Sequence, residues 1–123
     1  MTDVDTALKE MMEIDGAIGV ALVDQATGTP LATSGGGKDL DLTVAAAANT
    51  DVVRAQLRAM ELLNFGEQVE DLLITLDSQY HLIRPVSSRR GKALFLYLAL
   101  RRDRANLALA RHQIRRIEAE LEA

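Results

Sequence analysis

Hydrophobic residues form one uninterrupted run near the end of the chain. Eight apolar residues occupy positions 93–100, between Lys92 and Arg101. A bilayer span needs about 20 apolar residues, so this run is too short to cross a membrane. A strand with one solvated face alternates apolar and polar residues, because successive side chains point to opposite faces. The run does not alternate, so we predict a central strand with helices covering both faces of its sheet.

The remaining pattern predicts three helices and four further strands. Apolar residues at helical spacing predict helices over residues 3–14, from Asp39 or Asp41 to about Asn64, and over residues 104–122. Segments rich in apolar residues and bounded by turn residues predict strands over residues 17–25, 30–34, 69–76 and 79–87. A turn at residues 88–91 leads into the apolar run.

The connections between neighbouring strands fix the expected topology. They are short, which favours hairpins and an antiparallel sheet. The first and fifth strands are the most apolar and belong at the centre, whereas Pro30 cannot donate to a ladder and places the second strand at an edge. The strand order 2-1-5-4-3 meets both conditions. We therefore predict one domain over residues 1–123 of the α/β class. It is a three-layer α/β/α sandwich with a five-stranded antiparallel sheet. The long helix covers one face, and the two terminal helices cover the other.

The predicted long helix carries more apolar surface than a single contact needs. Part of this surface is lined with alanine, which lets another backbone approach closely. The third strand, at the far edge of the sheet, exposes apolar side chains beside unpaired backbone groups. Such an edge promotes aggregation unless it is covered or paired. Pairing two copies about a two-fold axis covers both surfaces. The predicted homodimer interface comprises Val69, Leu72, Leu73 and Ile74 on the strand, and Ala48, Val52, Ala55 and Ala59 on the helix.

Charge and composition narrow the classes of partner. The formal net charge of −4 disfavours nucleic acid as a partner. The chain contains no cysteine, which excludes disulfides and thiolate metal sites. Its acidic first residues do not have the layout of a signal peptide, and no stretch reaches membrane-spanning length. We expect a cytoplasmic protein without membrane insertion.

A glycine-rich segment and two histidines are candidates for phosphate or metal binding, and the sequence supports neither function. The segment Gly35-Gly36-Gly37-Lys38 is similar to a phosphate-binding loop, but Ala32 replaces the first glycine of that motif and Asp39 replaces its Ser or Thr. A flexible connection before the helix is the better interpretation. His81 and His112 lack further ligands at metal-binding spacing. We therefore expect no catalytic residues, no cofactor and no metal, and a protein that is not an enzyme.

The order of elements and several segments resemble the roadblock family of small cytoplasmic domains, which is related to dynein light chains. The similarity covers almost the whole chain. The segments that carry it are residues 19–24 with Thr27-Gly28, residues 42–45, residues 70–75, residues 80–84 and residues 94–98. The family has no invariant catalytic signature, so the resemblance is one of pattern.

This resemblance implies a function and an assembly. Roadblock domains are homodimers or heterodimers in which the third strands pair edge to edge and the long helices lie side by side. Bacterial members regulate or scaffold small Ras-like GTPases. The expected function is therefore a non-catalytic homodimeric interaction module whose partner is a small GTPase. Arg54 and Arg58, on the polar side of the long helix, are the expected partner contacts. The alternative is a small-ligand-binding sensor domain, which requires a buried cavity with convergent polar groups.

Overall fold

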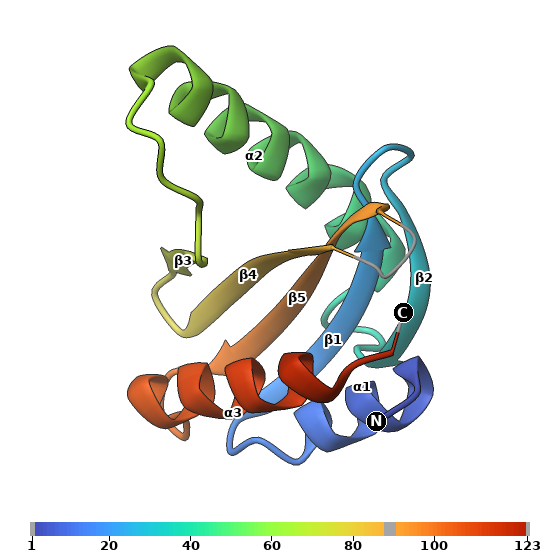
Figure 1. Cartoon of the computed structure of the whole chain (residues 1–123). Coiled ribbons are helices and arrows are strands. Elements are labelled where there is room, and N and C mark those ends of the chain that lie inside the picture. Colours follow the sequence, from blue (N-terminus) through green and yellow to red (C-terminus); the bar gives the residue numbers. More distant parts are fainter. Residues whose placement is uncertain (1, 88–90, 123) are drawn as a thin grey trace.

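The computed structural model describes residues 2–87 and 91–122 of the chain (Figure 1). The helices are α1 (Val4–Met12), α2 (Leu42–Leu63) and α3 (Leu107–Glu120), and the strands are β1 (Ala17–Asp24), β2 (Thr29–Gly35), β3 (Leu72–Thr75), β4 (Gln79–Ser87) and β5 (Ala93–Arg101). The five strands form one antiparallel sheet in the order β2-β1-β5-β4-β3. The predicted class and strand order are confirmed. Residues 88–90 of the expected turn lie outside the described residues.

Helices cover both faces of the sheet, as the apolar run requires. Figure 1 shows α2 on one face and α1 with α3 side by side on the other. The side chains of β5 alternate between two cores. Four leucines, including Leu96 and Leu98, face α1 and α3, whereas Phe95, Tyr97 and Ala99 face α2. Each of these side chains is at most 2% exposed. The run is uniformly apolar because neither face of β5 meets water.

Polar residues set the ends of the long helices. Of the two caps considered for α2, Asp41 is the one used, and its carboxylate accepts hydrogen bonds from the backbone N–H groups of Thr43 (3.0 Å) and Val44 (3.2 Å). Asn64 ends α2 in a left-handed conformation, with φ of 54°. α3 begins three residues later than predicted. Asn106 caps it by accepting from the N–H of Leu109 at 3.1 Å, and residues 102–104 form the preceding turn.

β3 is shorter than the sequence predicted, because β4 lacks one donor. The N–H of Leu76 donates to the carbonyl of Gln79 at 2.8 Å, so the backbone groups of Gln79 face β3. Backbone groups point to alternate sides along a strand, and those of the other odd-numbered residues of β4 therefore also face β3. Pro85 belongs to this set and has no N–H to give. The ladder therefore stops at the pair Leu72 and Ile83. Val69, predicted to lie in this strand, instead lies in the unpaired segment that precedes it.

Candidate interaction surface

A stripe of apolar residues runs the length of α2 outside the face that packs on the sheet. We call it the outer stripe. Large members are conspicuously exposed: Leu62 by 77%, Val44 by 62% and Leu63 by 54%. Smaller residues connect them at helical spacing. The outer stripe consists of Val44, Ala48, Val52, Ala55, Ala59, Leu62 and Leu63.

The outer stripe exists because α2 has a separate face for the sheet. The buried residues of that inner face are Leu42, Ala45, Ala46, Thr50 and Val53, all in the first part of the helix. All but Thr50 belong to the core cluster that contains Val23 of β1 and Phe95 and Tyr97 of β5. Beyond Val53 the helix diverges from the sheet (Figure 1), and no residue of its remainder is buried. The apolar residues of the outer stripe are therefore not needed to hold α2 in place.

β3 presents an unpaired edge at the end of the sheet. Leu72 and Ile74 direct their backbone groups toward β4, so those of Leu73 and Thr75 point outward. The side chains of Leu72 and Ile74 pack against the core under α2, whereas Leu73 packs against the core under α1 and α3. All three are half-buried. A charge at Leu73 would therefore perturb folding as well as the edge.

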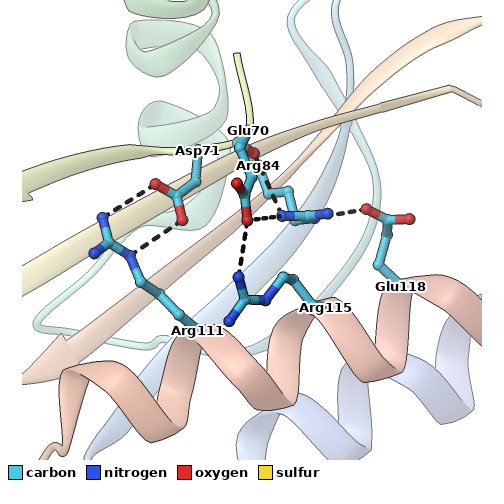
Figure 2. A network of polar contacts seen from close by, with 6 residues as sticks. All are labelled: Glu70, Asp71, Arg84, Arg111, Arg115 and Glu118. Atoms are coloured by element: carbon cyan, nitrogen blue, oxygen red, sulfur yellow. Dashed lines mark hydrogen bonds and ion pairs between the residues drawn. The ribbon is translucent and has the colours of Figure 1, made fainter. Parts of the chain in front are cut away.

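A network of charges fastens the segment before β3 to α3 (Figure 2). Arg111 binds the carboxylate of Asp71 through two contacts of 3.1 Å each. Arg115 binds Glu70 at 2.9 Å. From β4, Arg84 binds Glu118 at 2.6 Å, and its Nη1 lies 3.8 Å from the Glu70 carboxylate. The same Nη1 lies 3.5 Å from the Glu70 carbonyl, the group that Pro85 leaves without a ladder donor. The network thus holds the edge of the sheet where the ladder ends.

A cleft of about 840 Å³ opens where α2 diverges from the sheet. Its walls come from the second half of α2, from the segment before β3 and from the end of β4. Its lining includes Leu57, Met60, Glu61, Glu67, Val69, Glu70, Arg84, Pro85, Val86 and Glu118. The cleft opens to solvent, and so differs from the buried cavity that a small-ligand sensor was expected to contain.

The two arginines expected to contact a partner differ in their surroundings. Both are exposed on α2. The Nη2 of Arg54 donates to the backbone carbonyls of Gln25 (2.8 Å) and Ala26 (2.6 Å), which ties the helix to the turn between β1 and β2. No hydrogen bond or ion pair joins the side chain of Arg58 to another described residue. A role for either arginine in partner binding stays a prediction, as does the role of the eight predicted interface residues.

One partly buried polar group lies on the α2 side of the sheet. Nδ1 of His81 lies 3.1 Å from the hydroxyl of Tyr97, and its Nε2 lies 2.8 Å from Oε1 of Gln79. Burial lowers the pKa of His81 and raises the pKa of Tyr97 to about 12. The three side chains satisfy one another. In the described part of the chain, no three acidic or histidine side chains gather so as to hold a metal ion. Among these residues, no helix has the length and apolarity needed to span a membrane.

Comparison with known proteins gives similarity at the level of structure. No protein-family model matches the sequence, and no curated protein matches it. Among solved structures, Myxococcus xanthus MglB superposes with a TM-score of 0.79 at 17% identity, over 93% of this chain and 87% of that one. A Roadblock/LC7 domain from Streptomyces avermitilis superposes with a TM-score of 0.78 at 15% identity, over 96% and 93%. A structure described as MglB with tetrameric arrangement gives 0.68 at 22% identity, over 93% and 86%.

The chain has a roadblock-type fold. The match extends over nearly the full length of each roadblock structure, so the outer stripe and the edge of β3 lie on elements that belong to the shared fold. Sequence identities this low establish the fold alone. The roadblock fold therefore identifies the architecture, and the function must be argued from the surface of this chain.

Proposed function

We propose that this chain is a non-catalytic cytoplasmic module that forms a homodimer and, as a dimer, regulates or scaffolds a small Ras-like GTPase. The observation that carries the proposal is that two surfaces are uncovered, the outer stripe of α2 and the unpaired edge of β3. Contiguous exposed apolar surface on this scale marks an interaction site. An unpaired edge invites pairing with another strand. One symmetric contact between two copies would cover both features.

The chemistry of the outer stripe favours a second copy as the first partner. Three of the four residues in its middle are alanines, Ala48, Ala55 and Ala59, which allow two helices to approach closely. Larger side chains at the ends, Val44 and Leu62, would pack around that close contact. A specific interface buries about 1,600 Å² in total, which a helix of six turns and a strand edge together can supply. The tetrameric arrangement of one MglB structure is consistent with a roadblock fold that self-associates.

Light scattering after size exclusion tests the assembly, with variants at each half of the proposed interface. Ala55→Arg places a charged side chain in the centre of the outer stripe, and we expect it to yield monomers. The matched control is Ala119→Arg, at an exposed alanine of α3 away from the stripe. If Ala119→Arg dissociates the protein to the same extent, the helix contact is not specific.

The edge of β3 is tested with proline. Thr75→Pro removes an outward backbone donor without breaking the ladder to β4, and we expect weaker association. Thr33→Pro is the matched control. Thr33 lies on β2 at the opposite edge of the sheet, and its backbone also points outward, because the carbonyl of Ile18 accepts from the N–H of Gly36. Equal effects at the two edges would argue against pairing through β3.

The GTPase part of the proposal rests on the roadblock fold and on the resemblance of the sequence, and needs its own experiment. Small GTPases encoded near the gene would be mixed with the purified protein, and binding and GTP turnover measured. We expect the wild type to bind, and we expect Arg58→Ala to bind more weakly, because the Arg58 side chain is exposed beside the outer stripe. Absence of binding to all of them would remove the GTPase as partner and leave the homodimer in place.

A further inference from the structure

We propose that the cleft beneath the second half of α2 is a docking groove for an extended basic segment of a partner protein. The occupant would lie extended beside the free part of β4 and donate a main-chain hydrogen bond to the carbonyl of Pro85. Its basic side chains would meet the carboxylates of the walls. The proposal concerns a different face of α2 from the outer stripe, so it does not depend on the proposed self-association.

Two stretches of backbone border the cleft with groups that no strand pairs. β4 continues to Ser87, but past Ile83 it pairs only with β5, which leaves the carbonyl of Pro85 directed into the cleft. On the other side, residues 66–69 form no backbone hydrogen bond within the described chain. A sheet edge of this kind is where extended peptides add a strand, their main-chain groups supplying affinity.

The chain is prevented from filling this gap itself. Pro85 withholds the donor that would let β3 lengthen. The charged network of Figure 2 fastens Glu70 and Asp71 to Arg115 and Arg111 on α3. The segment before β3 is thus fixed at its end, and the unpaired acceptor of Pro85 stays available to another chain.

The charge of the walls selects a basic occupant. Four carboxylates line the cleft, from Glu61, Glu67, Glu70 and Glu118, against one cation, Arg84. Arg84 is already engaged with Glu118 at 2.6 Å. The carboxylates of Glu61 and Glu67 are exposed and form no hydrogen bond or ion pair within the described residues. Lysine or arginine side chains would satisfy both carboxylates.

Apolar side chains between these carboxylates complete the specificity. Leu57, Met60, Val69 and Val86 line the same cleft and are half-buried. Because successive side chains of an added strand point to opposite faces, an occupant with alternating basic and apolar residues would place one set against each kind of wall. The geometry therefore points to a short extended segment in which lysine or arginine alternates with aliphatic residues.

The test uses a fluorescein-labelled peptide of alternating lysine and valine, with alternating glutamate and valine as the charge-reversed control. Fluorescence anisotropy with the full chain measures binding. We expect the lysine peptide to bind and the glutamate peptide not to. The double variant Glu61→Gln with Glu67→Gln should bind about five-fold more weakly, as the loss of two exposed ion pairs implies. The matched control, Glu13→Gln with Asp15→Asn, removes two exposed carboxylates at the end of α1 and should leave binding unchanged.

Hydrogen exchange locates the peptide. On binding, the amides of residues 66–69 should exchange more slowly, and light scattering should report the same number of protein chains per particle as without peptide. Absence of binding, equal weakening in the two double variants, or binding that leaves those amides unprotected would each overturn the docking groove. None of these outcomes bears on the outer stripe, so failure here and failure of the homodimer are separate results.

Discussion

Removing the side chain of Arg84 tests whether the charged network holds the edge of the sheet in place. The Arg84 side chain is only 18% exposed and that of Glu118 is 28% exposed, and they meet at 2.6 Å. A hydrogen bond to a charged group contributes about 1.5–3 kcal/mol, and stripping the partner from a buried charge costs about 3–5 kcal/mol. Glu118 retains some contact with water, so we expect Arg84→Ala to lower the free energy of unfolding by about 2 kcal/mol.

Urea denaturation at fixed protein concentration measures this loss, because dimerisation would make stability depend on concentration. With a urea dependence of about 2 kcal/mol per molar, the midpoint should fall by about 1 M. The matched control is Arg101→Ala. Arg101 also pairs with a carboxylate, that of Asp103 at 2.7 Å, but the two side chains are 52% and 65% exposed. Its loss should cost about 0.2–1 kcal/mol.

A double-mutant cycle separates the ion pair from the packing of the arginine stem. We expect Arg84→Ala and Glu118→Ala to be coupled by more than 1 kcal/mol, a value that neighbours in one network commonly reach (about 0.5–3 kcal/mol). If Arg84→Ala costs no more than Arg101→Ala, or if the coupling is close to zero, the network does not fasten the edge and our account of this region is wrong.

Four further expectations follow from packing and burial. Phe95→Ala should lower the free energy of unfolding by about 3–5 kcal/mol in urea denaturation, because Phe95 is fully buried. Gly35→Ala should destabilise the fold in the same assay, since φ is +74° and a Cβ there would lie 2.6 Å from Cε of Met12. Burial raises the pKa of Tyr97 to about 12 from 10.0, so its contribution to stability is present below pH 10 and lost as the pH rises toward 12, a decline that Tyr97→Phe should reduce. Burial lowers the pKa of His81 below 6.5, so its contribution is present above pH 6.5 and lost as the pH falls through the folded-state pKa, which His81→Gln should suppress.

Much of the fold could be predicted because a few residues exclude the alternatives. A run that is apolar on both faces requires a central strand, and Pro30 requires an edge strand, which together leave few orders for five antiparallel strands. The doubled apolar face of α2 could also be recognised from helical spacing alone, since the inner and outer sets are offset around the helix.

The parts that could not be predicted depend on contacts between residues distant in the sequence. The end of β3 is set by Pro85 on the neighbouring strand, because only the register shows which side its missing donor faces. The tie between Arg111 and Asp71 joins residues 40 positions apart and follows from where α3 lies across the sheet. The sequence predicts Arg54 to be a solvated charge. In the structure its guanidinium donates hydrogen bonds to the turn between β1 and β2.

The docking groove had no signal in the sequence for the same reason. Its carboxylates come from α2, α3 and the segment before β3, and the divergence of α2 from the sheet brings them around one cleft.

The mass of the wild-type protein in solution tests the central claim most directly. One chain has a mass of 13.4 kDa. Light scattering at micromolar concentration should give twice this mass for the wild type and the single-chain mass for Ala55→Arg, with both proteins folded by circular dichroism. A wild type that remains a single chain across the micromolar range would contradict the account, because the outer stripe and the edge of β3 would then lack the partner for which they are proposed.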